Sequence, residues 1–266
     1  MELEQKRADF ERSGYGVAAI SFDRAPLLKN FAERKGIHYP LLSDADSKTI
    51  ESFGILNTNV PKDHTTYGIP FPGTFVVDEK GVVQAKYFED DHVDRYTVSS
   101  ILVRTLGHHA SGQSEIEAKH IKLRLSLSDA VVRAGNRLIL SIDAELPGGM
   151  HVYAPGVEGG YIPVEWRMDE TKEWFAHPMT PPGSRKLHLP AIGETVPVYE
   201  GKFRLIRDLT IGQLRGPARD LDILGTFRYQ ACDDRICYPP ENVPLKWTMR
   251  LEPHDSQRAP VELQRK

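Results

Sequence analysis

Residues 221–252 read LDILGTFRYQACDDRICYPPENVPLKWTMRLE. Apolar and polar residues alternate in LDILGTFRYQA (221–231) and again in VPLKWTMRLE (243–252), which is the period of a strand with one buried face. The segment between these two runs contains Cys232 and Cys237, the only cysteines of the 266-residue chain. Any disulfide within the chain must therefore join these two residues.

The same alternation extends upstream of this stretch, and turns rich in proline and glycine separate the runs. The alternating runs are IKLRLSLS (121–128), RLILSIDAEL (137–146) and GKFRLIRDLTI (201–211). Several strands with no helical period between them predict an antiparallel β-sandwich of the immunoglobulin-like class over residues 119–252. We expect a polar linker at 107–118, where the sequence is GHHASGQSEIEA, and a polar tail at 253–266.

The spacing of the two cysteines requires a turn between them. An extended chain would hold their Cα atoms roughly 16 Å apart, whereas a disulfide needs about 4.4–6.8 Å. Asp233 and Asp234 favour a turn, and Pro239-Pro240 ends the strand ladder directly afterwards. So small a loop stabilises by only about 2 kcal/mol, against about 4.7 kcal/mol for a 100-residue loop. The pattern favours a redox switch at a sheet end over a structural staple.

Residues around the cysteines supply charge and aromatic surface. Asp233 and Asp234 disfavour a thiolate and Arg235 favours one, so the sequence leaves the net sign open. Two roles also remain open for a set of apolar neighbours, either a lid over the bridge or ordinary sheet packing. This set is Tyr229, Ile236 and Tyr238.

YQACDDRICYPPENVPL resembles the dithiol segment of the N-terminal periplasmic domain of DsbD, a protein that relays reducing equivalents across the bacterial inner membrane. GMHVYAPGVEGGYIPVEW (149–166) and VYEGKFRLIRDLTI (198–211) resemble further stretches of that domain. The resemblance implies an immunoglobulin-like fold and electron exchange with thioredoxin-like proteins through mixed disulfides, with a membrane electron conductor as a further candidate partner. It also implies that Cys237 attacks the partner and that Cys232 resolves the mixed disulfide. The intercysteine loop is shorter here than in many members of that family.

Residues 1–106 show an α/β pattern instead. We expect strands at 16–22 and 39–42, a hairpin at 74–88 and a last helix at 93–106. Two more helices are expected at 25–36, with Pro26 at its start and Gly36 just past its end, and at 47–54, with Asp46 as its N-cap.

SGYGVAAISFDRAPLLKNFAERKGIHYPLLSDADSKTIESFGI and IPFPGTFVVDEKGVV resemble the redoxin branch of the thioredoxin fold, which includes peroxiredoxins and TlpA-like proteins. In that fold the reactive cysteine opens the first long helix, and this sequence has none there. We therefore expect an incomplete thioredoxin-like domain without its first strand and active-site turn. Either Met1 is not the native start, or the domain has lost its chemistry. The resemblance also makes Pro72 a candidate for the cis-proline of the thioredoxin fold.

Composition excludes several classes of function. Net charge is −3 and no basic block is present, so we expect no nucleic-acid partner. No apolar run reaches the roughly 20 residues of a membrane span, so we expect no membrane insertion. We expect no cofactor and no metal: His151, His177 and His188 are far from the cysteines in sequence and lack ligand spacing, and His108-His109 reads as solvated linker.

The sequence thus predicts a thiol-disulfide oxidoreductase that works through Cys232 and Cys237. Two alternatives are a peroxiredoxin-like antioxidant protein with an accessory sandwich, and a non-catalytic module that binds a redox partner and holds a structural disulfide. The expected location is periplasmic or otherwise extracytoplasmic if the native start lies upstream, and cytoplasmic if Met1 is genuine.

Overall fold

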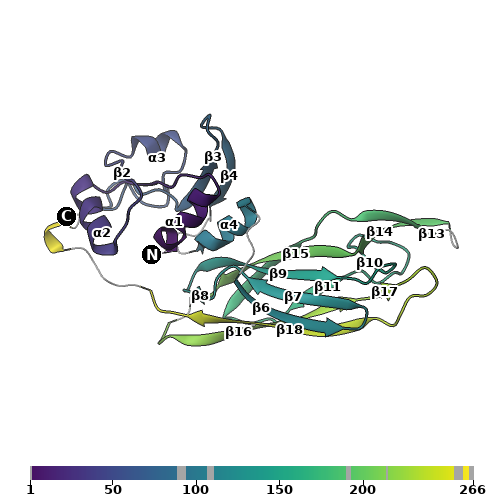
Figure 1. Ribbon diagram of the computed structural model, residues 1–266. Coiled ribbons are helices and arrows are strands. Elements are labelled where there is room, and N and C mark those ends of the chain that lie inside the picture. Colours follow the sequence, from purple (N-terminus) through teal and green to yellow (C-terminus); the bar gives the residue numbers. More distant parts are fainter. Residues whose placement is uncertain are drawn as a thin grey trace. The chain divides into compact units, whose positions relative to one another are not determined.

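The computed structural model describes residues 2–88, 94–106, 111–189, 193–213, 215–254 and 260–263. The chain divides into two compact units, one of residues 1–107 with 254–266 and one of residues 108–253 (Figure 1). None of the described helices combines the length and the apolar character that crossing a bilayer requires. The two expected fold classes, thioredoxin-like α/β and antiparallel β-sandwich, are both present.

The first unit is built from short helices and two small sheets. Its sheets pair β1 with β2 in parallel and β3 with β4 in an antiparallel hairpin. The elements are α1 (Glu2–Arg12), β1 (Ala19–Ser21), α2 (Ala25–Lys35), β2 (Leu41–Ser43), α3 (Lys48–Ser52), β3 (Gly73–Val77), β4 (Val83–Phe88), β5 (Arg95–Tyr96) and α4 (Val98–Leu106), with the 3-10 turn η1 (Val261–Leu263) near the C-terminus.

Helix ends in this unit follow local sequence rules, with one correction. Helix α2 has a proline in its first turn and ends at Gly36, whose φ of 61° is the left-handed conformation that glycine adopts without strain. Helix α3 is capped differently from the sequence prediction, because Ser47 occupies its N-cap position and Asp46 does not. The carboxylate of Asp44 accepts the backbone N–H groups of Thr49 and Ile50 and so supplies the missing cap.

A second correction concerns Pro72. The described residues contain no cis peptide bond, so the Phe71–Pro72 bond is trans. The trans form is the favoured state of an X–Pro bond, and the tertiary contacts of β3 do not override it here. The expectation of a cis-proline at this position was wrong.

The second unit is a sandwich of antiparallel sheets (Figure 1). One sheet has the order β12-β15-β9-β7-β6 and faces a sheet of order β11-β16-β18-β8, in which β8 pairs parallel to β18. These strands are β6 (Ser111–Ala118), β7 (Ile121–Leu127), β8 (Val131–Val132), β9 (Asn136–Glu145), β11 (Glu165–Met168), β12 (Trp174–Thr180), β15 (Lys202–Ile211), β16 (Arg219–Tyr229) and β18 (Glu241–Leu251).

Alternation along the strands creates the core between these sheets. In β18 every second residue from Val243 to Leu251 is buried, and β16 repeats the pattern. Trp247 of β18 stacks on Trp166 of β11, with ring centroids 5.5 Å apart. Burial on one face fixes the register of each strand, since a slip by one residue would bring every core side chain to the surface.

The expected linker is only partly a linker. Residues 111–118 form β6, which pairs with β7 from Ser111↔Leu127 to Ala118↔Ile121. The sequence there is polar because β6 is an edge strand, and Ile116 is its main apolar contact with the core. His108 and His109 lie outside the described residues.

A third sheet lies at one end of the sandwich and holds Cys232 (Figure 1). Its order is β13-β14-β10-β17, with β17 at the edge. The strands are β10 (His151–Tyr153), β13 (Arg185–Leu189), β14 (Glu194–Glu200) and β17 (Ala231–Cys232).

Candidate redox site

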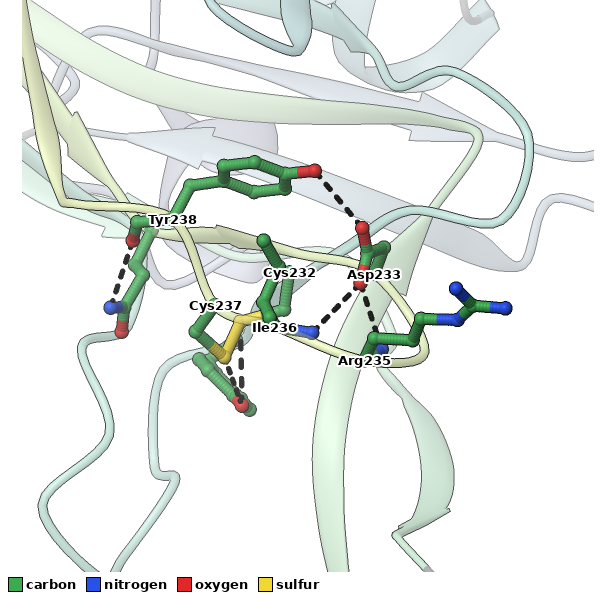
Figure 2. Close-up of a disulfide and its surroundings, with 8 residues drawn as sticks. Cys232, Asp233, Arg235, Ile236, Cys237 and Tyr238 are labelled. Atoms are coloured by element: carbon green, nitrogen blue, oxygen red, sulfur yellow. Dashed lines mark hydrogen bonds between the residues drawn. A yellow bond between two sulfur atoms is a disulfide. The ribbon is translucent and has the colours of Figure 1, made fainter.

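Cys232 and Cys237 form a disulfide (Figure 2), as the turn between them predicted. Their Cα atoms lie 4.0 Å apart, inside the limit of about 7 Å beyond which no bridge can form. Cys232 ends the two-residue edge strand β17, and Cys237 faces it across an isolated bridge. The bridge thus sits at an irregular sheet end.

The two sulfur-bearing residues differ sharply in exposure. Cys232 is 1% exposed and packs with Tyr153, Val196 and Val198 in a small apolar cluster. Cys237 is exposed at the surface. Of the two cysteines, Cys237 is therefore the one that lies at the surface of the domain.

Asp233 holds the turn between the cysteines. Its carboxylate accepts the backbone N–H groups of Arg235 and Ile236, each at 2.8 Å, and the hydroxyl of Tyr238 at 3.0 Å (Figure 2). These donors, with the Ile236 amide the strongest, lower the pKa of Asp233 below its ordinary value. The hydrogen bond from the Tyr238 hydroxyl to Asp233 raises the pKa of Tyr238. Asp233 therefore acts as the turn's anchor, and its charge is compensated locally.

The other predicted neighbours lie in different surroundings. Arg235 and Asp234 are exposed, and the Arg235 side chain extends away from the disulfide (Figure 2). Ile236 is 55% exposed beside the bridge, so it is a surface residue and not a closed lid. Tyr229 is buried in the sandwich core, and its hydroxyl donates to the Lys119 carbonyl. Burial raises the pKa of Tyr229 to about 12.

Tyr153 on β10 contacts the disulfide directly and was missed in the sequence. Its hydroxyl oxygen lies 3.4 Å from Sγ of Cys237 and 3.6 Å from Sγ of Cys232. Disulfide sulfurs carry no proton, so the hydroxyl is the donor to both. Tyr161 packs on the Tyr153 ring and donates its own hydroxyl to Glu194, which raises the pKa of Tyr161 to about 12. In the sequence, only the resemblance of the segment that contains HVYAPG (151–156) to the DsbD domain pointed to this region.

Acid should release the Asp233 anchor only below the usual range of aspartate titration. The folded pKa is depressed, so the turn's contribution to stability is complete above the unfolded pKa of about 3.9 and is lost as pH falls through the lower folded value. NMR shifts of the Arg235 and Ile236 amides, followed against pH, measure this midpoint. The Asp233→Asn variant is the control and should show no such titration; a midpoint at or above about 3.9 would contradict the anchor role.

Comparison with known proteins agrees with this division of the chain. Residues 1–86 match the model of the AhpC/TSA family, and residues 125–246 match that of the N-terminal region of the thiol:disulfide interchange protein DsbD. A peroxiredoxin-like protein of Mycobacterium tuberculosis is 36% identical over 87 residues, which are 32% of this chain and 55% of that protein. A second, from Coxiella burnetii, is 29% identical over 93 residues, or 58% of its length. The chain thus spans little more than half of these relatives.

Two solved structures match about half of this chain at low similarity. The N-terminal periplasmic domain of ScsB from Proteus mirabilis matches 53% of this chain and 50% of its own, at 12% identity and a TM-score of 0.35. The reduced DsbD N-terminal domain of Neisseria meningitidis matches 50% of this chain and 90% of its own, at 13% identity and a TM-score of 0.33. The chain therefore resembles a redoxin segment joined to a DsbD N-terminal domain, and these family matches with the disulfide support a redox, thiol-disulfide function.

Proposed function

We propose that this protein is a thiol-disulfide oxidoreductase that exchanges electrons with thioredoxin-like partners through Cys232 and Cys237. The observation that carries this proposal is the unequal exposure of the two cysteines, one buried and one at the surface of the same disulfide. Exchange proceeds through a mixed disulfide, which forms at an accessible sulfur and is resolved by a second thiol close to it.

The roles follow from this geometry. A partner thiolate attacks Sγ of Cys237, and Cys232 leaves as a thiolate. In the opposite direction, Cys237 attacks a partner disulfide and Cys232 resolves the product. The Tyr153 hydroxyl, within reach of both sulfurs, can donate a charge-assisted hydrogen bond to whichever one carries the negative charge.

We further propose an extracytoplasmic location, where a disulfide persists between turnovers. The dithiol domain would then pass electrons to or from separate thioredoxin-like proteins, because residues 1–107 contain no cysteine that could take part. A membrane electron conductor is a further candidate donor.

A redox titration of the Cys232–Cys237 pair tests the function. We expect a midpoint between about −270 and −120 mV, the range of known exchange proteins. The measurement is the fraction of free thiol after equilibration with a series of thiol and disulfide buffers. A midpoint below about −300 mV would instead assign a structural disulfide and a role in binding a redox partner without catalysis.

A peroxiredoxin-like antioxidant function is the second candidate, and the match of residues 1–86 to the AhpC/TSA family favours it. Peroxide reduction by a peroxiredoxin needs a reactive thiol, and residues 1–107 contain no cysteine. Within this sequence only Cys237 could attack a peroxide. Thiol-disulfide exchange is therefore the function that the site supports best.

A further inference from the structure

Three side chains form a row across the sheet that carries the disulfide. His151 of β10 is the register partner of Cys232 on one side and of Glu200 on the other. Directly opposed residues in antiparallel strands project to the same face, with Cβ atoms about 4.5–5.5 Å apart. A carboxylate, an imidazole and a thiol-forming sulfur thus follow one another on adjacent strands.

His151 is buried in an unusual way. It is only 4% exposed, and its Nε2 atom has no hydrogen-bond partner among the described residues. Its ring meets that of Tyr153 edge to face, with centroids 5.6 Å apart. Buried polar atoms are rarely unpaired, because an unpaired atom loses its hydrogen bonds to water without replacement. The unpaired Nε2 atom of His151 is explained if it gains a hydrogen-bond partner in another redox state of the site.

We propose that His151 is the proton acceptor for the Cys232 thiol in the step that resolves the mixed disulfide. In the oxidised protein Cys232 has no proton to offer, which accounts for the unpaired nitrogen. Reduction creates an S–H donor on the neighbouring strand. This inference rests on the proposed function, because only an exchange reaction requires Cys232 to become a nucleophile.

The step balances without another reactant. With Cys237 joined to a partner sulfur, the Cys232 thiol gives its proton to Nε2 of His151. The thiolate then attacks Sγ of Cys237, and the bond between Cys237 and the partner breaks. The partner leaves as a thiolate and recovers the proton from the imidazolium. In this step Cys232 is oxidised, Cys237 remains in a disulfide and the partner sulfur is reduced.

The charges around His151 suit an acceptor that is neutral at rest. Burial has the largest effect and lowers the pKa of His151 below its ordinary value, so the ring is unprotonated near neutral pH. Glu200, Asp234 and Asp233 act in the opposite direction and favour the imidazolium once it forms. Glu200 also pairs with Arg185, at 2.6 Å, which holds its carboxylate in place.

Stopped-flow reaction of the reduced protein with dithiobis(nitrobenzoic acid) separates the two thiol steps. Attack by Cys237 releases a first coloured thiolate, and attack by Cys232 on the mixed disulfide releases a second. In His151→Phe we expect an unchanged first phase and a second phase that is roughly 100-fold slower near pH 7. The wild-type second phase should slow in acid as His151 is protonated, and this dependence should vanish in the variant. His188→Phe, an exposed histidine of the same sheet, is the matched control and should change neither phase.

The outcomes are distinct. A second phase with unchanged rate and pH dependence in His151→Phe, or an equal slowing of both phases, overturns the proton-acceptor role. Absence of both phases in the wild-type protein overturns the proposed function itself. If His151→Phe does not fold, His151→Gln keeps a polar side chain at the position and should show the same selective loss.

Discussion

Replacing Cys237 with serine should abolish electron transfer to a thioredoxin-like partner, while Cys232→Ser should trap a covalent complex with it. In the proposed mechanism the partner reaches Cys237, the surface residue of the pair, and the buried Cys232 releases the partner again. The measurement is a non-reducing gel of each variant, prepared in its reduced state and mixed with an oxidised thioredoxin-like protein, together with the rate of partner reduction.

The double variant with both cysteines changed to serine is the control and should form no adduct. Reductant should dissolve the complex trapped by Cys232→Ser, since the link is a disulfide. A stable adduct with Cys237→Ser and none with Cys232→Ser would reverse the two roles. If neither variant forms an adduct, the disulfide does not take part in thiol-disulfide exchange.

Trp247→Ala should lower the free energy of unfolding of the second unit by about 3–5 kcal/mol. Trp247 is 2% exposed, stacks on Trp166 and donates its indole N–H to the Ser126 carbonyl. The substitution leaves a cavity in the core and removes the hydrogen bond to the Ser126 carbonyl. Because β18 begins directly after the cysteine loop, the disulfide should also become easier to reduce as the sandwich loosens.

Denaturant unfolding measures the loss, and Thr248→Ala is the control on the same strand. Thr248 points outward and bonds Asp222, so its removal should change the free energy by less than about 1 kcal/mol. Similar midpoints for Trp247→Ala and Thr248→Ala would show that the inter-sheet packing described here does not dominate stability.

The sequence predicted the cysteine loop well because the information is local. Asp233 and the Pro239-Pro240 pair act within a few residues of the cysteines, and both shape the loop through rules of turns and ladders. Long alternating runs such as β16 and β18 were equally predictable, since one-sided burial imposes their period. The Asp46 cap was wrong because Asp44 reaches the same amides from two residues earlier.

The rest of the site depends on which strands become neighbours. Tyr153 and His151 precede the cysteines by about 80 residues, and only the pairing of β10 with β17 brings them together. No periodicity in either strand encodes that pairing, and both strands are too short to show one. For the same reason His151 looked remote from the cysteines in the sequence, although it lies directly opposite Cys232.

One-sided access to the disulfide has a kinetic consequence. A sulfur attacked in exchange must be approached from outside, and in the proposed mechanism the burial of Cys232 makes Cys237 the single point of attack. An electron donor and an electron acceptor must then visit the same atom in turn. Turnover should follow a double-displacement scheme. The electron donor at high concentration should inhibit by binding the reduced form, and the electron acceptor by binding the oxidised form.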